Sequence, residues 1–298
     1  MWSWSFLKGV LSFLLITLNT LVCFIPVMLL ALCKLIVTFS PVRTALNIAL
    51  DGVATIWIAI NNINQRFFEQ SVIEVSGSEK LSTKEWYMIT ANHQSWVDIL
   101  ILQRLFNQRI PFIKFFLKKE LIWVPFIGLV WWALDFPFMK RYSQALLKKR
   151  PELKGKDIEA TKAACEKFQY SPVSIMNFLE GTRFTSDKHQ QQNNAFKHLL
   201  SPKAGGLSFA LNAMNGKLRH LIDVTIVYPD GAPRFFDYLC GRVSTIKVHI
   251  LVTPIQDDLL GDYQNDPEFR TSFQQWVNDL WKKKDRQISL MLGVDNDD

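Results

Sequence analysis

Apolar residues are concentrated near the start of the chain, where almost every position over residues 10–32 is hydrophobic. This run of about 23 residues would measure roughly 34 Å as a helix, which is long enough to span a bilayer. A second, shorter run over residues 45–60 carries Asn47 and Asp51. Polar positions of this kind are typical of a helix that packs on the first or lies at a membrane interface. The pattern therefore predicts an N-terminal membrane-embedded helical segment.

A secretory signal peptide is the alternative interpretation of the first run. The run is too long for the apolar part of such a peptide, and no small-residue cleavage site follows it. We therefore expect residues 1–66 to form a retained membrane anchor and residues 67–298 to form a second domain. The pattern leaves open whether the anchor is an antiparallel hairpin in one leaflet or a full span.

After residue 66, short strand-like runs alternate with helical patterns. Strands are predicted over residues 72–75, 86–90, 111–116, 136–141, 173–177 and 221–228, with a strand pair in 243–253. Helices are predicted over residues 98–106, 157–168, 204–212 and 266–284, and a polar loop over 186–194. This alternation predicts an α/β fold with a mixed central sheet flanked by helices, and functional residues at strand ends.

A third apolar block covers residues 121–134 and contains Trp123, Trp131 and Trp132. With about fourteen residues, it is too short to cross a membrane as a helix. Two interpretations remain open for this block. One is a buried helix, and the other is an interfacial wedge whose tryptophans lie at the depth that aromatic residues favour.

The composition agrees with contact to a membrane. Hydrophobic residues make up 49% of the 298 residues, with 10 Trp and 22 Phe, and the formal net charge is +7. A basic excess with many aromatic residues fits an anionic lipid surface, and it also fits nucleic acid. The four cysteines form no C-x-x-C pair, so we expect them to be reduced packing residues in a cytosol-facing protein.

The first candidate chemistry lies directly after the strand predicted over residues 86–90. Asn92 and His93 come first, and Asp98 follows five positions after the histidine. If the chain turns into a helix near Ser95, Asp98 folds back onto the imidazole and holds the tautomer that accepts a proton near neutral pH. Asn92 would support the same turn. A histidine beside an aspartate also occurs as a purely structural pair, and this motif alone does not decide.

A second motif, Glu180-Gly181-Thr182-Arg183, follows the strand predicted over residues 173–177. Gly181 permits a sharp turn. Arg183 offers a planar fork that suits a phosphate group. The motif therefore predicts a turn that presents a cation to an anionic ligand.

The two motifs together, Asn-His-x4-Asp and then Glu-Gly-Thr-Arg roughly ninety residues later, resemble those of the glycerolipid acyltransferase superfamily. The chain is similar to the bacterial PlsC-type 1-acylglycerol-3-phosphate acyltransferases, and in particular to their YihG-like branch. The resemblance covers about residues 85–253. It implies a mixed central sheet and makes residues 67–298 the catalytic domain.

The resemblance also implies direct acyl transfer. His93 would act as general base on the free 2-hydroxyl of a lysophospholipid, and Asp98 would orient and stabilise the imidazolium. Arg183 and Arg141 would hold the phosphate, Glu180 would brace its loop, and backbone amides of that loop would approach the acceptor. The acceptor-binding positions implied by the family pattern are Asn92, Arg141, Glu180, Gly181, Thr182 and Arg183.

Acyl-CoA or acyl-carrier protein would be the donor substrate, and neither a cofactor nor a metal ion is implied. The expected partners are membrane phospholipids, a lysophospholipid acceptor and the acyl donor, and no nucleic acid. The expected location is the inner (cytoplasmic) membrane of a bacterial cell, with the catalytic domain facing the cytosol, where thioester donors are found.

Some positions depart from the family pattern. Lys140 stands where an Asp or Asn commonly precedes Arg141, which leaves open a solvated strand end there. Leu179 replaces the usual proline before Glu180, and residues 225–228 replace a Val-Pro-like element. At the last two places the chain resembles the lysocardiolipin and lysophosphatidylinositol acyltransferases. A larger lysophospholipid acceptor therefore remains an alternative.

Other classes of function explain the sequence less well. A serine hydrolase of the nucleophile-elbow type would need G-x-S-x-G, which does not occur. A metal hydrolase would need clustered ligands, but the remaining histidines are scattered without paired spacing. A non-enzymatic membrane- or nucleic-acid-binding protein fits the basic charge but explains neither motif.

Overall fold

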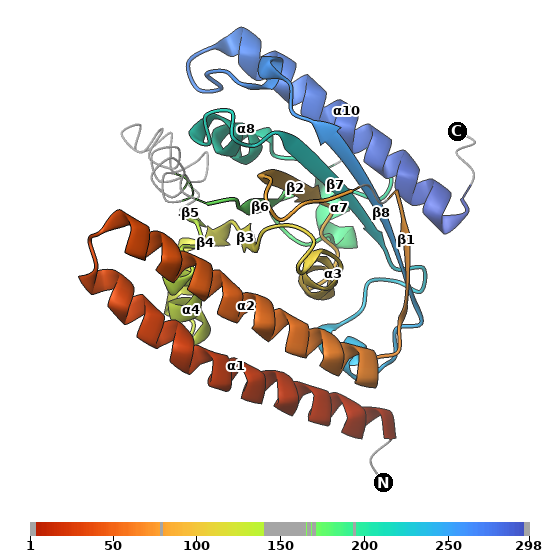
Figure 1. The fold of residues 1–298 in the computed structure, drawn as a ribbon. Coiled ribbons are helices and arrows are strands. Elements are labelled where there is room, and N and C mark those ends of the chain that lie inside the picture. Colours follow the sequence, from red (N-terminus) through yellow and green to blue (C-terminus); the bar gives the residue numbers. More distant parts are fainter. Residues whose placement is uncertain are drawn as a thin grey trace.

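The structure, a computed structural model, describes residues 4–77, 80–139, 165, 168, 171–192 and 195–294. A six-stranded sheet lies between two layers of helices (Figure 1). The two N-terminal helices and α3 (Val97–Phe106) cover one face, and α8 (Ala204–Ala213) and α10 (Pro267–Leu292) cover the other. Each layer shares a hydrophobic core with the strand side chains that face it.

The strand order in the sheet is β1-β8-β7-β2-β6-β3. Neighbouring strands are parallel except for β7 and β8, which are antiparallel, so the predicted mixed α/β sheet is confirmed. The strands are β1 (Val72–Ser76), β2 (Tyr87–Ala91), β3 (Ile113–Phe115), β6 (Ser174–Phe178), β7 (His220–Val227) and β8 (Thr245–Pro254). A separate parallel pair is formed by β4 (Leu117–Lys118) and β5 (Phe138–Met139).

Period-two alternation in the strands distributes their side chains between the two cores. In β2, Tyr87, Ile89 and Ala91 belong to the core under the N-terminal helices, and Met88 belongs to the core under α8 and α10. Every residue of β2 is buried, as expected for a central strand covered on both faces. The first motif follows directly after this strand, so it starts from a fully buried strand of the sheet.

Helices α1 (Trp4–Ile36) and α2 (Ser40–Phe68) form an antiparallel hairpin, and both are longer than the apolar runs that predicted them. Both are long and apolar enough to cross a membrane. Asn19 Nδ2 donates to Asn61 Oδ1 over 2.8 Å, and Asn64 Nδ2 donates to Ser12 Oγ over 3.1 Å. Such interhelical hydrogen bonds hold helices together where water does not compete.

The predicted polar loop over residues 186–194 is wrong in its first part, which forms helix α7 (Ser186–Gln192). The helix begins there because the Thr185 hydroxyl accepts the backbone N–H of Lys188 over 3.3 Å. The predicted strand pair over residues 243–253 is also wrong. The segment is the single ten-residue strand β8, whose alternation continues without a turn.

The apolar block over residues 121–134 is divided between two short elements. A 3-10 helix, η1 (Lys119–Trp123), is followed by α4 (Ile127–Ala133). The chain turns between them at Phe126, whose φ of 60° is incompatible with a continuous helix. A single buried helix is therefore excluded, because Trp123 is 85% exposed.

Among the described residues, the remaining helical elements are α9 (Phe235–Leu239), η3 (Asp257–Leu259) and the long terminal helix α10. Asp266 begins α10 by accepting the N–H groups of Glu268 and Phe269, both over 3.0 Å. The predicted helix over residues 157–168 and the predicted phosphate ligand Arg141 lie outside the described residues, apart from the buried Cys165 and Phe168.

Candidate active site

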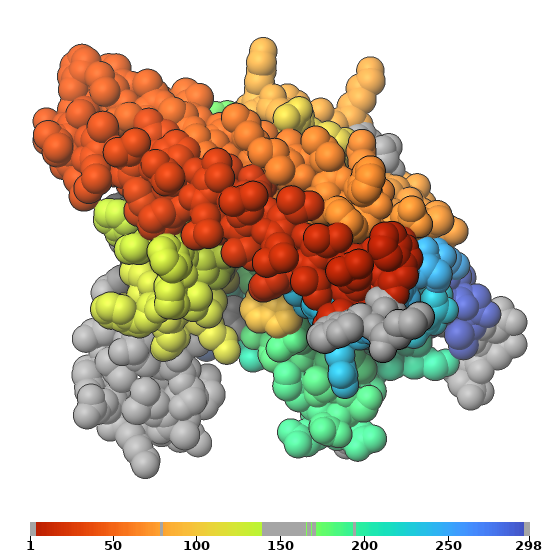
Figure 2. Space-filling model, turned by 90° about the horizontal axis from the view of Figure 1, so that it is seen from below, coloured from red at the N-terminus to blue at the C-terminus, as the bar shows by residue number. Residues whose placement is uncertain are grey.

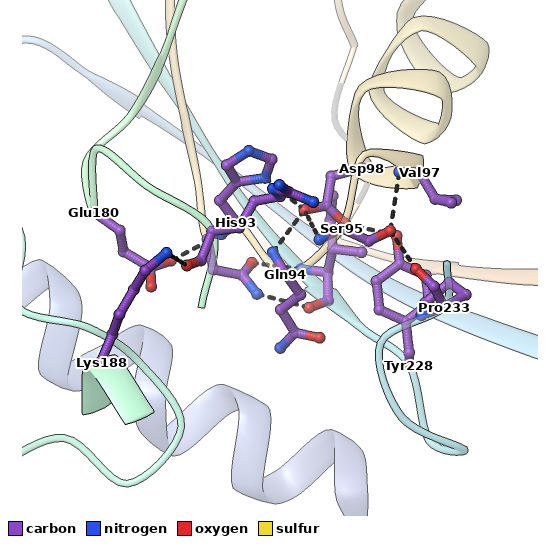
Figure 3. A network of polar contacts seen from close by, with 12 residues as sticks. His93, Gln94, Ser95, Val97, Asp98, Glu180, Lys188, Tyr228 and Pro233 are labelled. Carbon is purple, nitrogen blue, oxygen red and sulfur yellow. Dashed lines mark hydrogen bonds and ion pairs between the residues drawn. The ribbon is translucent and has the colours of Figure 1, made fainter. Parts of the chain in front are cut away.

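Strand register brings the two motifs together at one edge of the sheet. Ala91 in β2 pairs with Phe178 in β6, and the chain continues for two residues from each strand to His93 and Glu180. Because parallel strands end at the same edge, the residues that follow them become neighbours although they are far apart in sequence. The backbone N–H of His93 donates to Glu180 Oε1 over 2.8 Å (Figure 3).

The predicted pairing of His93 with Asp98 is present. His93 Nδ1 lies 2.9 Å from Asp98 Oδ2, and the chain turns into α3 directly after Ser95, as the first motif required. Nδ1–H donates to the carboxylate, so Nε2 carries the lone pair that can accept a proton. The imidazole stacks on the ring of Phe178, with centroids 3.9 Å apart and planes inclined by 13°.

Asp98 is fully buried, and its carboxylate is surrounded by hydrogen-bond donors. Besides the imidazole, Oδ2 accepts the backbone N–H groups of Gln94 and Ser95 over 2.7 and 2.9 Å. The Tyr228 hydroxyl donates to Oδ1 over 2.6 Å. These contacts offset the cost of burying the charge and fix the carboxylate at the N-terminus of α3.

Asn92 occupies a structural position beside His93. Its side chain is fully buried, and its amide group bonds the backbone of Ile226 in both directions, each over 2.8 Å. These bonds assign it to support of the turn, which was one of its two predicted roles. Ser95 fixes the other side of the loop by donating to the Pro233 carbonyl over 2.6 Å.

The loop of the second motif is built around Glu180. This buried carboxylate accepts the N–H of His93 with one oxygen and the N–H of Leu200 with the other, over 3.0 Å. Gly181 has a φ of 70°, which is the conformation that glycine adopts without strain. Its backbone N–H donates a hydrogen bond to the Phe178 carbonyl over 2.9 Å, and this bond closes the turn.

The cations of this loop lie at the open side of the site. Arg183 is exposed, and its guanidinium lies over the ring of Trp96, 5.1 Å from the centroid. Lys188 on α7 donates to Thr182 Oγ1 over 2.8 Å and to the Arg183 carbonyl over 3.0 Å (Figure 3). The loop and α7 therefore place two cationic side chains at this side of the site.

Three residues of the site were not predicted from the sequence. Tyr228 was noted only as part of a changed strand end, and Lys188 and Trp96 were not singled out. The position of Tyr228 directly after β7 was an available signal, because strand ends at this edge line the site. Nothing in the sequence pointed to Lys188 as a site residue, because its segment was interpreted as a polar loop.

Burial raises the pKa of Glu180 to about 7, and the hydrogen bonds from the His93 and Leu200 amides oppose the rise. The ordinary value for a glutamate in an unfolded chain is 4.5, so the folded protein binds this proton more tightly. Stability should therefore fall as pH rises from about 4.5 to 7, by on the order of 3 kcal/mol from this group.

The substitution Glu180→Gln should remove this contribution. We expect the difference in free energy of unfolding, variant minus wild type, to rise between about pH 4.5 and 7 and to stay constant above about pH 8. Denaturant unfolding of the full chain in detergent at several pH values measures it. Asp187→Asn, which changes an exposed carboxyl on α7, is the matched control. A pH-independent difference for Glu180→Gln would contradict the prediction.

The profile of the family described as Acyltransferase matches residues 72–229, which include both motifs. The mouse 1-acyl-sn-glycerol-3-phosphate acyltransferase gamma is 25% identical over 230 residues, covering 74% of this chain and 55% of that protein. The Arabidopsis thaliana 1-acyl-sn-glycerol-3-phosphate acyltransferase 3 is 25% identical over 254 residues, covering 80% and 60%. The chain thus spans little more than half the length of these curated relatives.

Among solved structures, the fold is similar to that of the 1-acyl-sn-glycerophosphate acyltransferase PlsC from Thermotoga maritima. The TM-score is 0.52 at 16% sequence identity, and the alignment covers 95% of this chain and 98% of that one. At this identity the similarity concerns the fold, which here includes the N-terminal helices because almost the whole chain is aligned.

Proposed function

The chain belongs to the acyltransferase family, and on this premise we propose that it acylates the sn-2 hydroxyl of 1-acylglycerol-3-phosphate to give phosphatidic acid. The donor is acyl-CoA or acyl-carrier protein. The observation that carries the proposal is the pairing of His93 with Asp98 beside the cationic loop of Arg183. The names of the similar proteins, which are acyltransferases for this acceptor, support it.

The mechanism follows from the orientation of His93. Nε2 accepts the proton of the acceptor hydroxyl as its oxygen attacks the thioester carbonyl. Asp98 stabilises the imidazolium that forms, as the aspartate of a Ser-His-Asp triad does, but here the substrate hydroxyl replaces the serine. Collapse of the tetrahedral intermediate breaks the carbon–sulfur bond, and the imidazolium returns its proton to the leaving thiolate. The products are the ester and the free thiol.

The cationic loop fixes the acceptor beside this base. Arg183 binds the phosphate of the lysophospholipid, and Trp96 holds the guanidinium plane in position. Lys188 braces the loop through its contacts with Thr182 and Arg183, and it adds positive charge. A ligand held at its headgroup presents its hydroxyl to His93 in a restricted orientation, which lowers the entropic part of the barrier.

The enzyme works at a membrane in this proposal, because its lysophospholipid acceptor and its phosphatidic acid product partition there. The apolar helices α1 and α2 and the basic net charge support membrane association. We further propose a bacterial inner-membrane enzyme of the YihG-like branch, with its catalytic domain on the cytosolic side where thioester donors are made. The resemblance of its motif residues supports this placement, and the named sequence relatives are eukaryotic.

The experiment that tests the proposed function is an acceptor panel. The purified full chain in detergent is supplied with acyl-CoA or acyl-carrier protein and with lysophosphatidic acid, lysophosphatidylinositol, lysocardiolipin or lysophosphatidylethanolamine. We expect the highest kcat/KM with lysophosphatidic acid. A preference for lysocardiolipin or lysophosphatidylinositol would favour the alternative acceptors that Leu179 and residues 225–228 suggest. Absence of acyl transfer to every acceptor would overturn the proposal.

Replacing Arg183 by alanine should weaken acceptor use much more than donor use. A charge-assisted hydrogen bond is worth roughly 1.5–3 kcal/mol, so we expect about a ten- to hundredfold loss in kcat/KM for the acceptor. The loss should be larger for lysophosphatidic acid, a phosphate monoester, than for a diester with less charge. Arg183→Lys should restore part of the activity, because a point charge does not reproduce the fork.

Steady-state kinetics with each substrate varied in turn separates these effects. The matched control is Arg286→Ala, which removes an exposed arginine from α10 on the far side of the sheet. An increase confined to the donor KM would assign Arg183 to the donor instead. Equal losses with monoester and diester acceptors would argue against lysophosphatidic acid as the preferred acceptor.

A further inference from the structure

An exposed group of apolar side chains projects from η1 and α4. Trp123 is 85% exposed, Phe126 56%, Leu129 49% and Trp132 39%. We call this group, with the neighbouring Val124, the aromatic corner. Large apolar side chains gathered on one surface mark a contact site, because a soluble surface seldom carries so many together. The proposed reaction does not use the aromatic corner.

The aromatic corner has a defined shape. A side chain added at Gly128 would meet the carbonyl oxygen of Ile122 at 2.2 Å, so the end of η1 packs directly against the backbone of α4. Phe126 adopts a left-handed φ of 60° at the turn between the two elements. The turn therefore holds Trp123 and Phe126 outward on a closely packed backbone.

The aromatic corner is fixed to helix α1. The ring of Phe126 meets that of Phe24 edge-on, with centroids 5.5 Å apart, and Lys34 forms an ion pair with Asp135 just after α4. Figure 2 shows η1 and α4 in yellow-green directly beside the red α1 on one face of the molecule. Helix α1 itself carries further exposed apolar residues: Leu18, Val22, Ile25, Leu29 and Leu32.

We propose that the aromatic corner inserts into the interfacial layer of an anionic phospholipid bilayer, as an anchor additional to the α1–α2 hairpin. The proposal rests on the proposed function at a membrane. Tryptophan and phenylalanine favour this depth, and the exposed Lys118 and Lys119 at the start of the segment complement anionic headgroups. The continuity with α1 and the projecting shape favour a lipid surface over a protein partner.

The position of the aromatic corner gives the anchor a consequence for the reaction. The segment lies between β4 and β5, which pair with each other, and β4 begins two residues after the end of β3. Phe115 of β3 stacks on Phe178, with centroids 6.2 Å apart, and Phe178 stacks on the imidazole of His93. Contact of the aromatic corner with lipid would therefore hold the mouth of the site against the bilayer, where the acceptor lies.

The experiment uses bromine quenching of tryptophan fluorescence. The full chain is reconstituted in phosphatidylglycerol–phosphatidylethanolamine vesicles with lipids brominated at acyl positions near the interface. Trp123→Phe removes one of 10 tryptophans and should lower the fraction of emission that the bromines quench. The matched control, Trp276→Phe, removes a half-buried tryptophan from α10 on the far side and should leave that fraction equal or higher.

A second readout is the catalytic effect of Trp123→Ser. We expect kcat/KM to fall about threefold or more for acceptor in anionic vesicles and by less than about twofold for acceptor in detergent micelles. If the wild type floats with vesicles and acylates lipid, but the two Trp→Phe variants quench alike, the inference is overturned and the proposed function stands. If the wild type neither floats nor acylates lipid, both are overturned.

Discussion

Replacing His93 by alanine is expected to lower kcat/KM for acyl transfer by about 10²–10⁴-fold, the usual contribution of a general base. The imidazole is held between Asp98 and the ring of Phe178, so Nε2 has one defined direction in which to accept a proton. Alanine leaves the oxygen of the acceptor without a base. The loss should appear in kcat, because the phosphate contacts that bind the acceptor lie on the other loop.

The effect should be catalytic and not structural. His93 stabilises its loop chiefly through its backbone, whose N–H bonds Glu180 and whose carbonyl accepts the N–H of Phe184 over 2.7 Å. Thermal unfolding and vesicle flotation of His93→Ala should therefore match the wild type. His249→Ala, on strand β8, is the control for loss of a histidine elsewhere. Near-normal turnover by His93→Ala would contradict the mechanism.

The local geometry of the first motif was predictable because its parts are close in sequence. Five positions separate His93 from Asp98, and a serine in between marks the start of a helix. These features alone bring the carboxylate onto the imidazole. Short apolar, strand-like runs likewise identified the strands that precede both motifs, and parallel pairing placed them at the same edge.

Contacts between distant segments were not predictable in this way. Tyr228 lies 130 residues after Asp98 in the sequence and donates a hydrogen bond to it. Lys284 on α10 is fully buried, and its Nζ lies 2.9 Å from Asp223 Oδ1 on β7. No spacing rule relates such positions, since strand order and register determine the contact. The segment of Lys188 was interpreted as a loop because a helix of seven polar residues has no apolar periodicity.

The relation of the anchor to the catalytic domain is also a property of tertiary packing. Val27 and Leu50 of the hairpin lie in the same hydrophobic core as Ile89 and Ile222 of the sheet. Asp51 was noted in the sequence only as a polar residue within the second apolar run. Its Oδ1 lies 3.2 Å from Lys114 Nζ of β3. The division after residue 66 stays a prediction. The shared core makes the hairpin a structural layer of the domain.

The second large effect is expected for Asp98→Asn, which should lower kcat by about 10²–10⁴-fold. The amide oxygen can still accept the N–H groups of Gln94 and Ser95 and of the imidazole, and the amide nitrogen then faces the Tyr228 hydroxyl, which can accept from it. The loop and the histidine tautomer are therefore expected to persist. What is lost is the negative charge that stabilises the imidazolium during the reaction.

The substitution Tyr228→Phe separates the effect of the Asp98 charge from the effect of the orientation that Asp98 gives to the imidazole. It removes one donor to Asp98 Oδ1 and leaves the negative charge and the contacts of Oδ2 in place. Burial, together with the nearby Asp98 carboxylate, raises the pKa of Tyr228 well above its ordinary value, so the hydroxyl is a neutral donor throughout an assay range near neutral pH. A net hydrogen bond to a charged group is worth roughly 1.5–3 kcal/mol, and we expect a loss of about tenfold.

Single-turnover rates of both variants, with the half-exposed Asp279→Asn on α10 as the control, distinguish the two contributions. If the charge of Asp98 dominates, Asp98→Asn is slower than Tyr228→Phe by at least about tenfold. If Tyr228→Phe is as slow as Asp98→Asn, the main contribution of Asp98 is orientation of the imidazole. If Asp98→Asn retains rates within about threefold of the wild type, the pair is structural, and the base must be sought elsewhere.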